Sequence, residues 1–176
     1  RFLHSFNRLT LQMLTFPKPL VAAIRGHAVA GGCILALGCD YRVMAEGKKL
    51  IGLNESKLGV PVPYPALRAL IEVVGGRVAR EVVDFAEFYP PDRALALGLV
   101  DRLVSAEQVE TIAINLAETL AEIPQPVYAR LKQDRRRPMI DDIEGCLAET
   151  EQAFLDHWFS PATRDTLRQA AEKFRP

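Results

Sequence analysis

The sequence has little of what marks several large classes of protein. Its 22 basic and 22 acidic side chains cancel, so no net charge draws it to nucleic acid or to an anionic membrane surface. No apolar run approaches the roughly eighteen residues of a membrane-spanning helix. Its three cysteines (Cys33, Cys39, Cys146) lack the spacing of a zinc site, which favours reduced thiols. We expect a globular cytoplasmic protein with a small ligand and neither a nucleic-acid nor a membrane partner.

The first residues also lack the features of a targeting segment. Arg1 to Phe6 contain neither the apolar core nor the cleavage site of a secretion signal, and the first residue is not methionine. We expect the chain to begin inside a longer protein or after processing. An active site can then be shared with residues that lie outside these 176 positions.

The residue pattern predicts an α/β core at 1–104, followed by a helical region at 105–176. In the first part, apolar spacing, prolines and glycines predict helices at 2–13, 34–39, 65–74, 77–85 and 91–97, and strands at 20–24, 41–44, 50–53 and 99–104. In the second part, they predict helices at 105–123, 127–137, 141–158 and 161–174. Ser105 and Gln108 have the spacing of a capping box, and Ser160 with Pro161 suits the start of the last helix.

A glycine turn leads into the short apolar helix at 34–39. In Ala30-Gly31-Gly32, the backbone N–H groups that begin the helix have no partner within it, and the helix dipole favours negative charge there. The turn can therefore hold an oxyanion. Glycines in this position can equally serve only to let the chain turn tightly or pack closely.

Most of the chain resembles the crotonase (enoyl-CoA hydratase/isomerase) family. The resemblance is carried by the stretches 16–42, 51–60 and 90–101, and its details are closest to the Δ3,Δ2-enoyl-CoA isomerase branch. It implies an α/β fold, a spiral of β-β-α turns with a C-terminal helical region that forms a homotrimer or a dimer of trimers. It also implies an acyl-CoA thioester as the ligand. No metal or redox cofactor is implied, because coenzyme A is part of the substrate.

The resemblance implies roles for single residues. Gly31 would give one backbone N–H to the thioester oxygen, and the second donor would come from an upstream loop, outside this chain, that also helps bind adenine. Family hydratases place one carboxylate just after the glycine turn and another near Asn54-Glu55. Here the first position is Ile34, so Glu55 is the single catalytic carboxylate. Ala30 and Ile34 would contact the substrate, and Tyr64 would line the acyl tunnel.

One carboxylate suits isomerisation better than hydration. Hydration needs a water held and polarised while a proton goes to the neighbouring carbon, which Ile34 cannot assist. Isomerisation needs one base that removes a proton from C2 and returns it to C4. Apolar surroundings are expected to raise the Glu55 pKa from about 4.3 towards neutrality, where a base works best. Taken by spacing alone, Glu55 could equally be a surface or helix-capping carboxylate.

Three other readings of function remain open: another crotonase reaction such as decarboxylation or thioester hydrolysis, a hydratase with its second carboxylate supplied from elsewhere, or a non-catalytic oligomerising fragment. Other reactive residues have simpler interpretations. Cys33 and Cys39 are expected to pack in the core rather than act as nucleophiles. The run Arg135 to Arg137 is expected to be a solvated helix face. Lys173 and Arg175 are placed to meet CoA phosphates, with no motif to decide between them.

Overall fold

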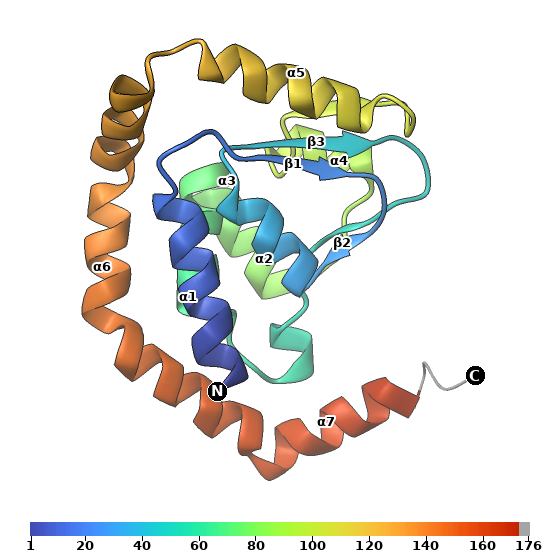
Figure 1. Cartoon of the computed structure of the whole chain (residues 1–176). Coiled ribbons are helices and arrows are strands. Elements are labelled where there is room, and N and C mark those ends of the chain that lie inside the picture. The colour runs from blue at the N-terminus through green and yellow to red at the C-terminus, as the bar shows by residue number, and fades with distance from the viewer. Residues whose placement is uncertain (173–176) are drawn as a thin grey trace.

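The computed structural model describes residues 1–172 and begins with a helix followed by a spiral of strands and helices (Figure 1). After α1 (Phe2–Thr15), one β-β-α turn is made of β1 (Val21–Ile24), β2 (Ala28–Val29) and α2 (Gly31–Gly38). The next turn repeats the order with β3 (Tyr41–Ala45), β4 (Ile51–Gly52), the 3-10 helix η1 (Ser56–Leu58) and α3 (Tyr64–Phe85). Next come α4 (Pro91–Leu97) and β5 (Arg102–Val104).

The strand register shows that this is a spiral. β1, β3 and β5 form one parallel sheet, in which Val21 pairs with Tyr41 and Val43 with Arg102. β2 and β4 form a second parallel pair, with Ala28 opposite Ile51. Each β-β-α turn therefore lays its strands beside the equivalent strands of the turn before. This confirms the predicted α/β spiral.

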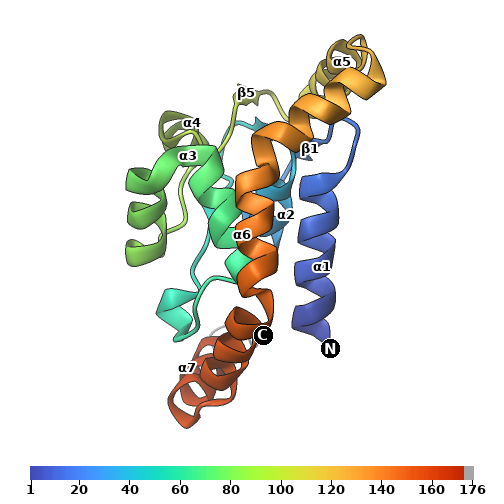
Figure 2. The same ribbon diagram turned by 90° about the vertical axis from the view of Figure 1, so that its left-hand side faces the viewer.

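Three helices complete the described chain: α5 (Val109–Ala121), α6 (Gln125–Phe159) and α7 (Pro161–Glu172). α5 packs on β1 and β3, while α6 follows the outside of the molecule and contacts α1 and α3 (Figures 1 and 2). The main core contains the buried side of α2 and includes Met139 and Ile143 of α6. The C-terminal helices thus share the core of the spiral. The division of the chain at residue 104 stays a prediction.

The structure corrects two predicted helix boundaries. α6 is one helix that runs through Pro138, where the sequence predicted two. A proline inside a helix removes one hydrogen bond and normally favours a break. Here Met139 and Ile143, in the turns that follow Pro138, are buried, and their packing accompanies an unbroken helix. The predicted capping box is also wrong, because α5 begins only at Val109 and Gln108 forms no side-chain cap.

Two other helix boundaries agree with the sequence pattern. Gly75 (φ 75°, ψ 158°) breaks α3 into the two predicted helices. Ser160 Oγ accepts a hydrogen bond from the Thr163 N–H at 3.3 Å, which caps α7 as expected. The predicted end of that helix at Phe174 lies outside the described residues, as do Lys173 and Arg175.

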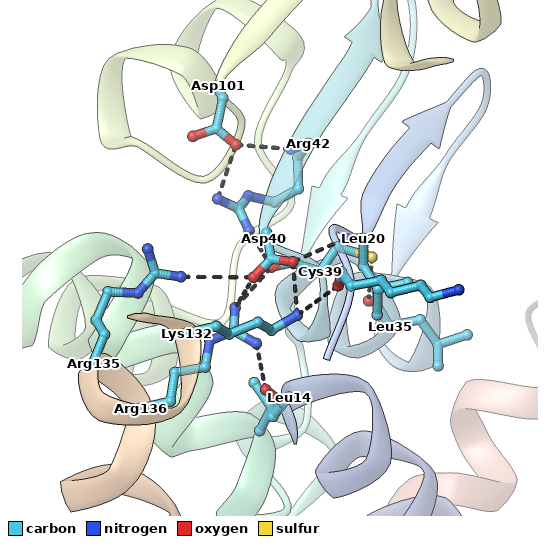
Figure 3. Close-up of polar contacts among 11 residues, drawn as sticks. Leu14, Leu20, Leu35, Cys39, Asp40, Arg42, Asp101, Lys132, Arg135 and Arg136 are labelled. Atoms are coloured by element: carbon cyan, nitrogen blue, oxygen red, sulfur yellow. Dashed lines mark hydrogen bonds and ion pairs between the residues drawn. The ribbon is translucent and has the colours of Figure 1, made fainter. Parts of the chain in front are cut away.

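A buried carboxylate fastens α6 to the spiral (Figure 3). The side chain of Asp40, which directly precedes β3, is 1% exposed. Its Oδ2 accepts hydrogen bonds from the Leu20 N–H at 2.9 Å and from Lys132 Nζ at 2.7 Å. Its Oδ1 lies 3.1 Å from Arg136 Nη2 and 3.6 Å from Arg135 Nη2. We call Asp40, Lys132 and Arg136 the Asp40 cluster.

This cluster corrects the reading of the arginine run as a solvated face. Arg136 is 5% exposed, and it also donates to the Leu14 carbonyl at 2.8 Å. Arg135 and Arg137 are exposed, as predicted. A nearby ion pair joins two parts of the spiral, because Arg42 Nη2 of β3 lies 2.8 Å from Oδ2 of Asp101, which precedes β5 (Figure 3). Cations that the sequence pattern assigned to the surface are therefore partly structural.

Candidate active site

A cavity of about 540 Å³ lies where α1, α2, the Glu55 segment and the end of α6 converge. Most of its wall is apolar. Five aromatic side chains line it: Phe2, Phe6, Phe154, Trp158 and Phe159. Phe2 stacks on Phe6 in α1, and Phe154 stacks on Trp158 in α6, with 5.8 Å between ring centroids in each pair. The two aromatic pairs form two walls of an apolar chamber of the size that small ligands occupy.

Glu55 brings a carboxylate into this chamber. It directly precedes η1, and its own carbonyl accepts hydrogen bonds from the N–H groups of Leu58 at 2.9 Å and Val60 at 3.1 Å. Its side chain is buried, and Oε2 has no hydrogen-bond partner among the described residues. Burial raises the pKa of Glu55 above its usual range, which is the predicted direction. A buried carboxylate with a raised pKa and one oxygen without a partner is suited to accept and return a proton.

Gly31 is the first residue of α2 and also lines the cavity. The first N–H groups of a helix have no acceptor within it, so this end of α2 offers hydrogen-bond donors to a ligand oxygen. Ala30, which precedes it, has φ 47° and ψ −117°, a conformation that L residues rarely adopt. Its N–H donates to the Gly52 carbonyl at 2.9 Å and its carbonyl accepts from the Ile34 N–H at 3.0 Å. These bonds hold the turn in a strained shape at the mouth of the helix.

Ile34 lies in the same cavity wall and is 3% exposed. Within residues 1–172, Glu55 is the single acidic side chain that lines the cavity. Cys33 is fully buried beside the site, and burial, followed by the nearby Glu55 carboxylate, raises its pKa to about 12. The thiol therefore stays protonated at cellular pH and has a packing role.

Four of the five predicted site residues thus meet in one cavity: Glu55, Gly31, Ile34 and Ala30. Tyr64 is not among the lining residues, although its neighbour Pro63 is. The Tyr64 hydroxyl instead donates to Asp142 Oδ2 on α6 at 2.7 Å, and Arg68 Nε lies 2.9 Å from the same oxygen. A role of Tyr64 in substrate binding stays a prediction, and its observed contact joins α3 to α6.

The sequence reading missed the contribution of α6 to the cavity. Phe154, Leu155, Trp158 and Phe159 come from a helix that the pattern assigned only to the C-terminal region. The available signal was the four-residue spacing of Phe154 and Trp158, which places them on one helix face. That spacing did not reveal what the face covers.

Residues 1–172 also bear on membranes, metals and disulfides. There, no helix is both long and apolar enough to cross a bilayer. In the same range, no group of three or more histidine, cysteine or acidic side chains is placed to hold a metal ion. All three cysteines are free thiols.

The fold and the cavity define a crotonase-type spiral with a helix N-terminus and a single carboxylate at an apolar chamber. The family model for enoyl-CoA hydratase/isomerase matches residues 2–176, and the chain belongs to this family. This confirms the predicted family.

Individual relatives include both isomerases and hydratases. The chain is 34% identical to the rat (Rattus norvegicus) mitochondrial enoyl-CoA delta isomerase 1, with 93% of this chain and 54% of the relative covered. It is 29% identical to a short-chain-enoyl-CoA hydratase of Clostridium acetobutylicum, with 95% and 64% covered. The chain thus spans about half the length of the rat isomerase.

Solved structures give the same result. The crystal structure of human mitochondrial delta3-delta2-enoyl-CoA isomerase superposes with a TM-score of 0.90 at 30% identity, covering 96% of this chain and 66% of that one. An enoyl-CoA hydratase from Mycobacterium marinum gives a TM-score of 0.78 at 28% identity, covering 85% and 66%. The fold is therefore shared by isomerases and hydratases, and the site must decide between the two reactions.

Proposed function

We propose that the complete protein moves the double bond of a 3-enoyl-CoA to give the 2-enoyl-CoA. The observation that carries this proposal is Glu55, a single buried carboxylate without a partner on Oε2, in an apolar cavity shared with Gly31 and Ile34. The delta isomerases among the relatives support the same reaction.

The reaction needs one base and one oxyanion site. Glu55 removes a proton from C2 of the 3-enoyl thioester, and the electron pair of that C–H bond moves into the thioester carbonyl to form an enolate. The N–H of Gly31 donates to the enolate oxygen as negative charge develops there. Glu55 then returns the proton to C4 while the double bond forms between C2 and C3. No net oxidation occurs, so the reaction calls for no redox cofactor.

Ile34 disfavours hydration at this site. Adding water to a 2-enoyl thioester requires a held and polarised water next to the double bond, and a second carboxylate usually assists. An isoleucine side chain neither donates nor accepts hydrogen bonds. Ile34 therefore serves the proposed reaction as an apolar wall that keeps water from the enolate.

The test is to follow formation of the conjugated 2-enoyl thioester by absorbance in the complete protein and two variants. Glu55→Gln removes the base, and Glu87→Gln is the matched control, because Glu87 is an exposed partner of Lys57. We expect Glu55→Gln to lower kcat by about 10²–10⁴-fold, and Glu87→Gln to leave it unchanged. Equal turnover by Glu55→Gln and the parent would sink the mechanism. Faster hydration of 2-enoyl-CoA than isomerisation by the parent would favour a hydratase.

We also propose a homotrimer or a dimer of trimers. Two large apolar side chains, Val127 and Leu131, lie one turn apart on α6 with 49% and 60% exposure, which suits a subunit contact. Native mass measurement of the complete protein tests this, and a monomer would contradict it.

For location, the free thiols support a reducing compartment such as the cytoplasm. The rat and human relatives are named as mitochondrial proteins, so cell fractionation is the deciding experiment.

A further inference from the structure

One buried residue of α7 touches the segment that carries Glu55. Within Pro161–Glu172, Thr163 is the buried residue, with 4% exposure. Its Oγ1 donates a hydrogen bond to the Gly59 carbonyl at 2.9 Å. Its own N–H is held by Ser160 Oγ at the start of α7. The hydroxyl is therefore fixed in place at a position 104 residues from its acceptor.

The contact reaches Glu55 through a single peptide group. The carbonyl of Gly59 and the N–H of Val60 belong to the same planar peptide unit. That Val60 N–H donates to the Glu55 carbonyl at 3.1 Å. The Thr163 hydroxyl thus fixes the orientation of this peptide plane. The N–H on the other edge of the same plane holds the Glu55 carbonyl. Hydrogen bonds in such a chain also polarise one another.

The backbone at residue 59 is shaped for this approach. Gly59 has φ 80° and ψ 17°, a left-handed conformation that favours glycine. A Cβ added there would lie 3.0 Å from Thr163 Oγ1, closer than ordinary contacts allow. A second attachment, from Ser56 Oγ to the Val83 carbonyl at 2.7 Å, ties the segment to α3 but is exposed. The α7 contact is the more buried of the two.

We infer that Thr163 is a positioning residue for Glu55. It does not line the cavity, so it acts through the Gly59–Val60 peptide and not on substrate. The inference rests on the proposed function of Glu55 as the base. It gives the C-terminal helical region a part in building the catalytic centre.

The test compares four variants of the complete protein in the isomerase assay. Thr163→Ala and Thr163→Val remove the hydroxyl, Thr163→Ser keeps it, and Thr166→Val is the control, because Thr166 bonds only within α7, to the Ala162 carbonyl. We expect the first two to lower kcat about tenfold, the equivalent of one hydrogen bond, with KM changed less than twofold. Thr163→Ser should restore the parent rate, and Thr166→Val should match the parent.

A pH profile separates positioning from a general loss of stability. When the peptide plane is released, water reaches the Glu55 carboxylate, so its pKa should fall towards the usual value and the acid limb of kcat/KM should move to lower pH. Among residues 1–172, the other charged or titratable side chains around Glu55 are Cys33 of α2, Arg1, which precedes α1, and Lys57 of η1. Burial raises the pKa of the Cys33 thiol to about 12, so this thiol does not contribute to the acid limb.

Two results would overturn the inference: an unchanged kcat and pH profile in Thr163→Ala, or a Thr163→Ser variant as slow as Thr163→Val. Thr163→Ala adds no bulk, so it serves if the valine variant does not fold. Glu55→Gln is measured alongside. If Glu55→Gln equals the parent, the proposed function fails; if it is slow while Thr163→Ala is normal, only the positioning role fails. A carbon-13 titration of the Glu55 carboxyl gives the same comparison without turnover.

Discussion

Two buried carboxylates in this chain have opposite surroundings. Asp40 has a side chain 1% exposed, a backbone donor and two buried cations, Lys132 and Arg136. Glu55 is 8% exposed and takes part in none of the ion pairs among residues 1–172, although one oxygen of each carboxylate lacks a hydrogen-bond donor. A buried charge that is paired can hold two elements together, while an unpaired one has a shifted pKa. The comparison therefore separates a structural acid from a chemical one.

The neighbouring thiols show that burial alone does not make this difference. Cys39 lies beside Asp40 and Cys33 beside Glu55, and burial is the largest cause that raises the pKa of each thiol. Around Cys39, Arg42, Lys132 and Arg136 oppose the effect of burial. Both thiols are buried, and the two regions differ in how many cations surround the acid.

The largest expected effect is a loss of stability when the structural carboxylate, Asp40, is replaced. Asp40→Asn would leave Lys132 and Arg136 buried without a counter-charge. Breaking a buried pair in this way typically costs about 3–5 kcal/mol of the free energy of unfolding. Urea unfolding curves of the complete protein, recorded at one fixed protein concentration, measure this loss. Asp165→Asn, which breaks the exposed pair with Arg168, should cost no more than about 1 kcal/mol. Equal losses in the two variants would contradict the structural role of Asp40.

The next effect is smaller and has the opposite sign. The folded-state pKa of Glu55 is raised by burial, so between its unfolded and folded pKa values the native state binds more protons than the unfolded state. Stability should fall as pH rises through that window, and the loss should persist at neutral pH. Glu55→Gln should remove this part of the pH dependence and raise the melting temperature at pH 7. A lower melting temperature at pH 7 would show that the charge is paired in solution.

Backbone strain at the oxyanion turn gives a gain of similar or smaller size. Ala30→Gly should relieve the conformation at φ 47° and ψ −117°, and it should raise the free energy of unfolding by about 1 kcal/mol without lowering kcat. Ala86→Gly is the matched control, because Ala86 has the same φ but an ordinary left-handed ψ of 46°. A gain at Ala86 and none at Ala30 would mean that the turn is not strained.

The smallest effect is a difference in thiol alkylation, which tests whether water reaches either of the two regions. Alkylation of the native protein at pH 8 should modify the half-buried Cys146 and spare both Cys33 and Cys39, because the raised pKa of each buried thiol leaves little thiolate. Peptide mass spectrometry reads the extent at each site. Faster modification of Cys33 than of Cys146 would show that water enters the Glu55 region.

The sequence predicted what local signals control. Pro91 and Gly98 bound α4, Gly75 breaks α3, and the glycine turn opens α2, since each of these depends on a few neighbouring residues. The meeting of Glu55 with Gly31 followed from the family resemblance.

Contacts between residues far apart in the sequence could not be predicted from local signals. Arg136 was assigned to the surface because its partner, Asp40, lies 96 residues earlier, and nothing in the local pattern joins them. The bond between the Tyr64 hydroxyl and Asp142 spans 78 residues, so the local pattern could not predict it. The same holds for Thr163 and Gly59. Side chains whose energy depends on a distant partner are predicted only once the fold is known.

The length of α6 has a consequence for the evolution of this chain. One helix carries Lys132 and Arg136 in its first half and Phe154 and Trp158 in its last turns. The aromatic wall lies about five helical turns from the anchored half. A substitution that shifts the anchored half would therefore also move this wall. Changes in ligand preference among descendants of this chain can therefore arise at positions that do not line the cavity. Directed evolution for a new substrate should include the Asp40 cluster in its libraries.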